Sequence, residues 1–205
     1  MEQPVGLVLC GGKSSRLRQD KSQINYHGAP QWQFLAGMLS ELCPKVIISC
    51  SYSQAAQYSR EVEGTHLANL FFCVDQPALA DSGPVSGVLS AFETVPATDL
   101  LNIGCDYPLI KKEDLEFLLS SRKPGTDAVC YHLEKENLDL PFPAIYERSI
   151  QKILLNLFHQ GKYSLREGLR EGNVLRLTPP HPERLISANT PEEVERMKAR
   201  ISQQA

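Results

Sequence analysis

The chain has 205 residues, of which 42% are hydrophobic and 22% charged, and its formal net charge is −3. These values are ordinary for a globular protein, and the length suits one domain with a substantial core. The small negative charge excludes a global attraction to nucleic acid or to an anionic membrane. No stretch approaches the roughly 20 apolar residues of a membrane-spanning helix. Because residues 1–4 also lack the basic start of a signal peptide, we expect a cytoplasmic protein.

Apolar runs alternate with helical patterns over the first 121 residues. The runs are short and largely apolar, as in "VGLVL" and "KVIIS", which is typical of buried strands. Such strands, separated by helices, predict an α/β fold: a mostly parallel, Rossmann-like sheet covered on both faces, in three layers. The predicted strands are 5–9, 45–49, 69–74 and 99–105, and the predicted helices are 30–42, 53–61, 83–94 and 111–121.

The last third of the chain is less regular. Gly161 is a typical helix stop, and "NTP" places Asn189 or Thr190 at the N-cap of the last helix with Pro191 at its first position. We find no repeat, low-complexity tract or linker, so the sequence predicts a single domain over residues 1–205. The predicted strands here are 127–133, 142–146 and 173–177, and the predicted helices are 149–161, 164–172 and 189–201.

Cysteine and histidine patterns do not indicate a metal centre or a nucleophile. No cysteines form CxxC pairs and most lie in apolar runs, so we expect buried, reduced thiols. The histidines are scattered without a nucleophile–base pattern, and we expect them at the surface or half-buried. The cysteines are Cys10, Cys43, Cys50, Cys73, Cys105 and Cys130, and the histidines are His27, His66, His132, His159 and His181.

A basic, glycine-containing segment follows the first predicted strand. The stretch "LVLCGGKSSRLRQDK" carries four positive residues against the single acid Asp20. Gly11 and Gly12 would let backbone amides approach a phosphate, and arginine can grip phosphate oxygens with two hydrogen bonds. The segment matches neither the P-loop nor the dinucleotide fingerprint. The residues alone leave two interpretations open: a phosphate-binding loop of a third kind, or a turn with a solvated basic face.

Two aspartates also follow predicted strands. Asp75 stands in "CVDQP" and Asp106 in "CDYPLI". Carboxylates at the carboxyl ends of parallel strands can hold Mg²⁺ together with substrate phosphates. Each can equally be a turn or cap aspartate. Gly83 and Pro84 start a helix at the same predicted edge, which is also ordinary helix-start chemistry.

Together these stretches resemble the MobA-type molybdenum cofactor guanylyltransferases, and the points of similarity run along nearly the whole chain. "LCGGKSSRLRQDK" is similar to the family's opening LAGGxSSRMGxDK, and "NYHGAP" to its LNGKPL turn. "GPVSG" resembles GPLAG, "CDYPLI" resembles CDxPxI, and "NTPEEVE" resembles NTPEEL. The resemblance implies a GT-A-like nucleotidyltransferase fold, with residues 1–110 as the nucleotide-binding part and 111–205 as the acceptor part.

The resemblance also implies an activity and its partners. The chain would transfer GMP from GTP to molybdopterin or Mo-molybdopterin with Mg²⁺, and it would release pyrophosphate. Other cofactor-biosynthesis proteins and molybdoenzymes would be further partners. Related cytidylyltransferases have alanine at the Gly11 position, where a methyl group would crowd guanine, so the glycine favours GTP over CTP.

Site residues carry over from the same motifs. Arg16, Lys21 and Asp106 would be catalytic, with Asp106 as the metal ligand and Lys21 on the nucleotide phosphates. Lys162, Arg166 and Asn189 are the acceptor-side candidates, although Lys162 and Arg166 can equally be solvated. The implied nucleotide-binding residues are Leu9, Cys10, Gly11, Gly12, Lys21, Ser49, Asp75 and Asp106.

Two positions depart from the family pattern. Arg18 replaces a glycine, and if that position needs a positive φ, arginine would cost about 1 kcal/mol. Ser49 replaces an asparagine and makes fewer hydrogen bonds. Three alternatives therefore stay open. They are a related transferase acting with CTP or on a sugar or polyol phosphate, a catalytically weak GTP-binding adaptor in cofactor delivery, and a nonenzymatic α/β domain that binds no nucleotide.

Overall fold

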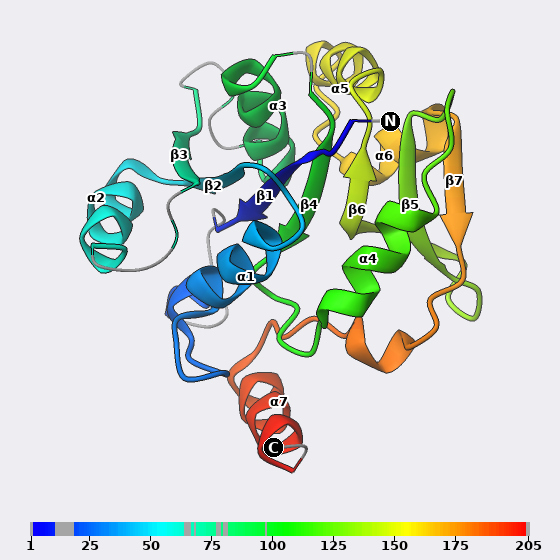
Figure 1. The fold of residues 1–205 in the computed structure, drawn as a ribbon. Coiled ribbons are helices and arrows are strands. Elements are labelled where there is room, and N and C mark those ends of the chain that lie inside the picture. The colour runs from blue at the N-terminus through cyan, green and yellow to red at the C-terminus, as the bar shows by residue number, and fades with distance from the viewer. Residues whose placement is uncertain are drawn as a thin grey trace.

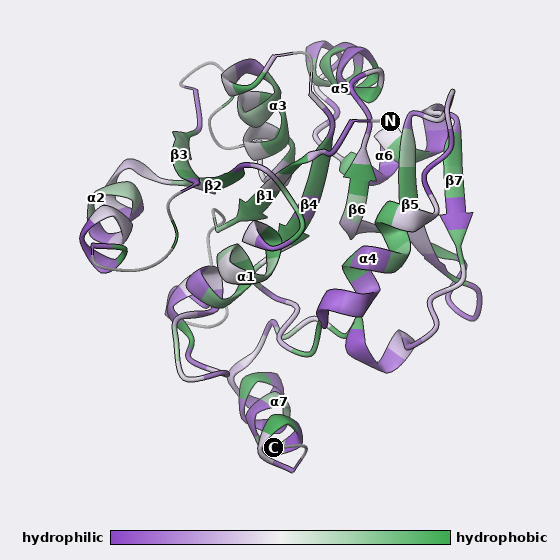
Figure 2. Ribbon diagram, in the orientation of Figure 1, coloured by the Kyte–Doolittle hydropathy of each residue, from purple (hydrophilic) through white to green (hydrophobic). Residues whose placement is uncertain are grey.

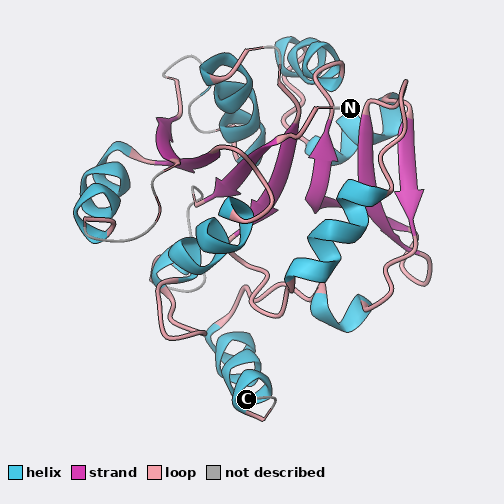
Figure 3. Ribbon diagram, in the orientation of Figure 1, coloured by secondary structure: helices cyan, strands magenta, loops and turns pink. Residues whose placement is uncertain are grey.

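A mixed β-sheet runs through the centre of the protein, in a computed structural model that describes residues 2–10, 19–63, 67, 69–76, 79, 82–96 and 98–203. Seven strands within these ranges form the sheet, in the order β3-β2-β1-β4-β6-β5-β7 (Figure 1). Helices lie on both sides of it (Figure 3). The predicted three-layer α/β fold is confirmed. The division of one domain at residue 110 stays a prediction.

Four parallel strands build the half of the sheet that carries the predicted site. Every residue of β1, β2 and β4 is buried, which agrees with their apolar sequences. Leu9 pairs with both Ser49 and Gly104, so the carboxyl ends of these three strands are level with one another. The strands are β1 (Val5–Leu9), β2 (Val46–Cys50), β3 (Leu70–Val74) and β4 (Leu100–Gly104).

The other half of the sheet contains an antiparallel strand that the sequence pattern does not predict as such. β6 (Leu138–Tyr146) lies between β4 and β5 (Ala128–Leu133) and runs antiparallel to both. The observed strand begins earlier than the predicted strand at 142–146. Polar and proline residues near its start hide the alternating pattern in the sequence, so the prediction missed that part. β7 (Val174–Leu177) pairs parallel with β5 and closes the sheet.

The helices cover the two faces of the sheet. Figure 2 shows hydrophobic residues concentrated in the central strands, whereas outer helices such as α4 carry both hydrophobic and hydrophilic residues. In Figure 1, α1 and α4 lie over one face, and α3, α5 and α6 over the other. The helices are α1 (Gln31–Ser40), α2 (Tyr52–Glu61), α3 (Pro84–Thr94), α4 (Lys112–Ser120), α5 (Ile150–His159), α6 (Leu165–Glu171) and α7 (Pro191–Ser202), with short 3₁₀ helices η1 (Lys21–Gln23) and η3 (Pro182–Arg184).

An apolar stripe on α1 packs against the sheet. Trp32, Leu35 and Leu39 are fully buried. Gly6 in β1 allows this helix to approach closely, because a Cβ there would lie 3.0 Å from Leu39 Cβ. Trp32 also stacks on Tyr58 of α2, with ring centroids 4.4 Å apart. Helices α1 and α2 therefore pack as a unit beside the first strands.

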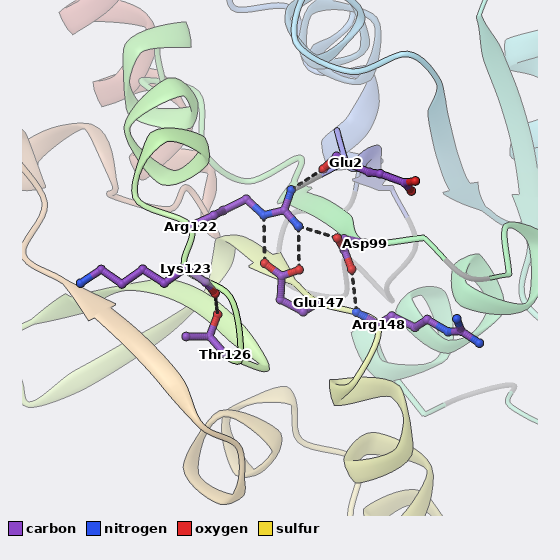
Figure 4. A network of polar contacts seen from close by, with 7 residues as sticks. All are labelled: Glu2, Asp99, Arg122, Lys123, Thr126, Glu147 and Arg148. Atoms are coloured by element: carbon purple, nitrogen blue, oxygen red, sulfur yellow. Dashed lines mark hydrogen bonds and ion pairs between the residues drawn. The ribbon is translucent and has the colours of Figure 1, made fainter.

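A buried arginine ties four segments together at the amino edge of the sheet (Figure 4). Arg122, just after α4, donates two hydrogen bonds to Glu147 at 2.9 and 2.6 Å and one to Glu2 O at 2.7 Å. It also pairs with Asp99, whose carboxylate accepts from Arg148 N at 2.9 Å. Because this cluster lies at the edge opposite the strand carboxyl ends, it stabilises the fold and takes no part in the predicted site.

The remaining sequence-based predictions on cysteines and helix ends hold where the structure describes them. All the cysteines predicted to be buried thiols are buried and free. Thr190 is the N-cap of α7 with Pro191 at its start, and Gly161 has φ +74° after α5. None of the helices in the described ranges combines the length and apolar character that a membrane span requires.

Candidate active site

The ends of β1 and β4 form the floor of the site. Leu9 and Gly104 are paired at the carboxyl edge of the sheet. The chain continues from them into Cys10 and Cys105, whose sulfur atoms lie 3.4 Å apart. The start of the basic segment and the loop that carries Asp106 therefore meet at one edge, as the parallel strands predict.

Asp106 is a half-buried carboxylate two residues beyond the end of β4. Burial raises the pKa of this carboxyl group, and the positive charge of Lys21 offsets part of the rise. Its hydrogen-bond partner among the described residues is its own backbone amide. Gly104 leaves room for the side chain, because a Cβ there would lie 2.6 Å from Asp106 Oδ1. Among the described residues no side chain donates a hydrogen bond to this carboxylate, which lies in a poorly solvated place.

Such a carboxylate fits a magnesium ion that arrives with a phosphate ligand. Mg²⁺ is bound in proteins by one or two carboxylates and fills its other positions with water and substrate phosphates. A cation beside Asp106 would also offset the desolvation that raises its pKa. The described residues contain no cluster of three or more His, Cys, Asp and Glu that could hold a metal without such a ligand.

Lys21 approaches the same edge from η1. Its Nζ donates a hydrogen bond to Asn189 Oδ1 at 2.5 Å, and its charge acts on Asp106. Asp20 caps η1 by accepting from Ser22 N at 2.9 Å. The backbone on both sides of Lys21 is therefore fixed, and its ammonium supplies positive charge beside the carboxylate.

The segment before α7 crosses the end of β4 and completes this arrangement. Ala188 N donates to the backbone oxygen of Asp106 at 2.8 Å. Asn189 N and Thr190 N both donate to Glu193 Oε2, at 2.7 and 3.0 Å, which fixes the segment on the helix. The resemblance implies an acceptor-side role for Asn189, and in the structure its side chain contacts Lys21.

Ser49 and Asp75 lie together beside the N-terminus of α3. Ser86 Oγ lies 2.6 Å from Asp75 Oδ2, and Ser49 Oγ donates to Asp75 Oδ1 at 3.4 Å. A Cβ on Gly87 would lie 2.5 Å from Ser49 Oγ and 2.6 Å from Leu9 Cδ2. The helix therefore touches the ends of β1 and β2 only because residue 87 is glycine. Leu9, Ser49 and Asp75 are brought together, as predicted.

Two tyrosines that the sequence analysis missed also lie near Asp106. Burial raises the pKa of Tyr26 to about 12, with a contribution from Asp106 and then Glu195. Burial and Asp106 raise the pKa of Tyr107, and the charge of Arg166 opposes this. Arg166 therefore lies within electrostatic reach of the site. Both tyrosines occur in mixed polar segments, where no periodic pattern marks them.

Other candidates are not brought to this edge or lie outside the described residues. Lys162 is exposed after Gly161, and its backbone N donates to Leu157 O at 3.0 Å at the end of α5. Gly11, Gly12 and Arg16, together with Lys13 and Arg18, lie outside the described residues.

Comparison with known proteins places the chain in a family. A family model described as "MobA-like NTP transferase domain" matches residues 6–177. A "Probable molybdenum cofactor guanylyltransferase" from Nostoc sp. is 28% identical over 200 residues, covering 95% of this chain and 90% of that protein. A "Molybdenum cofactor biosynthesis bifunctional protein" from Synechocystis sp. is 36% identical over 153 residues, covering 75% of this chain but 40% of that longer protein.

A solved structure supports the fold. The crystal structure of "Molybdopterin-guanine dinucleotide biosynthesis protein A" from Archaeoglobus fulgidus superposes with a TM-score of 0.75 at 21% identity, covering 97% of this chain and 99% of that one. This likeness confirms the nucleotidyltransferase fold predicted from the motifs. With the family match over most of its length and the motifs at one sheet edge, the chain belongs to the MobA-like NTP transferase family.

Proposed function

We propose that this chain transfers GMP from GTP to the terminal phosphate of molybdopterin or Mo-molybdopterin. An oxygen of the acceptor phosphate attacks the α-phosphorus of GTP, the bond from that phosphorus to the bridging oxygen breaks, and pyrophosphate leaves. The name of the Nostoc relative agrees with the predicted guanylyltransferase enzyme. The choice of GTP over CTP rests on the sequence argument at Gly11, and the acceptor rests on the relatives' names.

The observation that carries the proposal is the meeting of Lys21 and Asp106 at the ends of β1 and β4. A triphosphate needs positive charge and a metal ligand within reach of one another. Lys21 supplies the first, and its hydrogen bond to Asn189 holds the ammonium in place. Asp106 supplies the second, as a carboxylate with a raised pKa that accepts no side-chain hydrogen bond from the described residues.

Asp106 is the residue that would hold Mg²⁺, which when bound supplies charge neutralisation on the phosphate oxygens and helps to orient them. Lys21 would stabilise the negative charge that grows on the leaving pyrophosphate. Asp75, held by Ser49 and Ser86, would contact the nucleoside. These residues act by positioning and by fixed charge.

A covalent enzyme intermediate is not required, and the nearest thiols are poor nucleophiles. Burial raises the pKa of Cys10, and its hydrogen bond with Cys105 adds to the rise. Burial raises the pKa of Cys50 to about 12. Because the thiolate is the reactive form, both side chains stay protonated and unreactive near neutral pH. Direct transfer between the two phosphates is therefore the simpler route.

The test is pyrophosphate release from ATP, GTP, CTP and UTP, each with and without molybdopterin, in Mg²⁺ and in EDTA. We expect release only with GTP, molybdopterin and Mg²⁺ together. Release with CTP, or with a sugar or polyol phosphate in place of molybdopterin, would identify a related transferase instead. GTP binding without release in any combination would indicate an adaptor, and the absence of nucleotide binding would refute the proposal.

A further inference from the structure

One side chain bridges the two ends of the basic segment. Gln54, in the first turn of α2, directs its Nε2 amide group to Asp20 Oδ2 at 2.6 Å and to Cys10 O at 3.5 Å. Cys10 is the last described residue before positions 11–18, and Asp20 is the second described residue after them. A single amide therefore spans the entry and the exit of the segment that carries the predicted phosphate-binding residues.

The orientation of this amide is determined by its partners. Its Oε1 accepts a hydrogen bond from Ser51 N at 2.8 Å, while Gln54 N donates to Ser51 Oγ at 3.3 Å. A flipped amide would set its NH₂ group against the Ser51 N–H and its oxygen against the Asp20 carboxylate. The hydrogen bonds thus assign the nitrogen to the side facing Asp20.

The other end of the bridge is anchored in the core. Asp20 Oδ1 accepts from Ser22 N at 2.9 Å and from Ser22 Oγ at 2.6 Å. Ser22 and Tyr58 are fully buried, and their hydroxyl groups are hydrogen-bonded to each other. Tyr58 belongs to α2, as Gln54 does. Helix α2 therefore holds the chain around Lys21 through both contacts, and Gln23 adds a third by donating to Glu61 at 3.3 Å.

We infer that Gln54 is a positioning residue for nucleotide binding, an inference that rests on the proposed function. Its amide holds the Asp20 carboxylate, and Asp20 sets the start of η1, from which Lys21 extends to Asn189. Gln54 acts through these residues and does not itself contact the substrate. Its role is to keep Lys21 and the two ends of the basic segment in the geometry that receives a triphosphate.

The chemistry of the bridge allows an exchange test. In Gln54→Glu the side chain keeps its shape and its acceptor for Ser51 N, but two carboxylates then face each other across the Asp20 contact, so they repel. In Asp20→Asn the new amide oxygen can still accept from Ser22, but the new NH₂ group then faces the NH₂ group of Gln54, so two donors oppose each other. In the double variant Asp20→Asn, Gln54→Glu, the amide and the carboxylate have exchanged places. The contact between positions 20 and 54 is restored and the acceptor for Ser22 is retained, whereas the longer hydrogen bond to Cys10 O, at 3.5 Å, is lost.

Binding of GTP with Mg²⁺ by calorimetry and the KM for GTP are measured for the single variants, the double variant and Gln57→Ala. Gln57 is an exposed glutamine on the same helix, whose side chain bonds to Glu61 at 2.6 Å. We expect each single exchange to weaken GTP binding and raise KM about tenfold, and the double variant to return within about threefold of the wild type. Gln57→Ala should bind GTP as the wild type does. The order of the variants by melting temperature should differ from their order by GTP affinity, because the loss of binding comes from positioning and not from stability.

Unchanged GTP binding in Gln54→Glu would overturn the inference while leaving the proposed function intact. A loss in both single variants that the double variant does not recover would overturn it as well, because the direct contact would then not be the cause. A wild-type chain that binds no nucleotide would refute the proposed function and this inference together.

Discussion

Lys21 Nζ donates a hydrogen bond to Asn189 Oδ1 at 2.5 Å, which joins two residues 168 positions apart in the chain. The contact connects the end of the basic segment to the segment before α7. That segment is in turn bonded to the loop of Asp106, through Ala188 N and the Asp106 backbone oxygen at 2.8 Å. The segment before the last helix therefore packs at the edge of the sheet where the first strand ends.

Asn189→Asp should weaken GTP binding about tenfold, because a carboxylate beside Lys21 would pair with the ammonium and compete with the phosphates. Calorimetric titration with GTP and Mg²⁺ measures this. Glu192→Gln, an exposed change in the first turn of α7, serves as the control and should bind as the wild type does. Equal affinity in Asn189→Asp would mean that Lys21 does not contact the phosphates.

Gly104→Ala should reduce activity without unfolding the protein. The added Cβ would lie 2.6 Å from Asp106 Oδ1, so the carboxylate must rotate away from its position. We expect turnover to fall about tenfold or more, compared with about 10³-fold for Asp106→Ala, and the Mg²⁺ concentration for half-maximal rate to rise.

Gly37→Ala is the matched control for that change. Gly37 lies in α1 with nothing within 4 Å of an added Cβ, so alanine should leave turnover unchanged and add about 1 kcal/mol of stability. Normal turnover and Mg²⁺ dependence in Gly104→Ala would show that the position of the Asp106 carboxylate is unimportant for the reaction.

Arg122→Met should lower the free energy of unfolding by about 3 kcal/mol, because it leaves the half-buried Asp99 and the buried Glu147 carboxylates without their partner. Urea denaturation measures the loss. Arg148→Met is the control, since the Arg148 side chain is exposed and only its backbone N bonds to Asp99 (Figure 4). A loss below about 1 kcal/mol in Arg122→Met would contradict the stabilising role of this cluster.

The free energy of unfolding should fall at alkaline pH, because the buried thiols ionise less readily in the folded chain than in the unfolded chain. Burial raises the pKa of Cys43, Cys50 and Cys130 to about 12, whereas an unfolded cysteine titrates near 8.5. A raised folded-state pKa gives stability that is complete below about pH 8.5 and is lost as the pH rises toward 12. Each thiol should cost about 2 kcal/mol by pH 10.

Urea denaturation of the wild type and of Cys43→Ala at pH 7.5, 9 and 10 measures this effect. Cys43→Ala lowers stability at pH 7.5 by removing buried volume, but its decline with pH should be shallower than that of the wild type. Parallel declines in the two proteins would contradict the assigned cause.

The apolar strands made the parallel half of the sheet predictable, and with it the placement of Leu9, Asp75 and Asp106 at one edge. Parallel strands must present their carboxyl ends together, so residues directly after them are neighbours whatever the intervening helices do. The antiparallel direction of β6 was not predictable, because it depends on pairing with β4 and not on any local pattern.

Polar residues that position the site without lying in it could also not be identified from the sequence. Gln54 looks like any glutamine on a polar helix, and only the folded structure shows that it bridges Cys10 and Asp20. Asn189 and Lys21 meet through long-range packing that no spacing encodes. Tyr26 and Tyr107 lack a periodic pattern, so their burial beside Asp106 could not be inferred from sequence.

The most direct measurement is a crystal structure of the chain with GTP and Mg²⁺. We expect the triphosphate at the ends of β1 and β4, with Lys21 Nζ on a phosphate oxygen and the metal coordinated by Asp106. Density for the nucleotide at any other surface, or a metal that does not touch Asp106, would contradict the assignment of this edge as the active site.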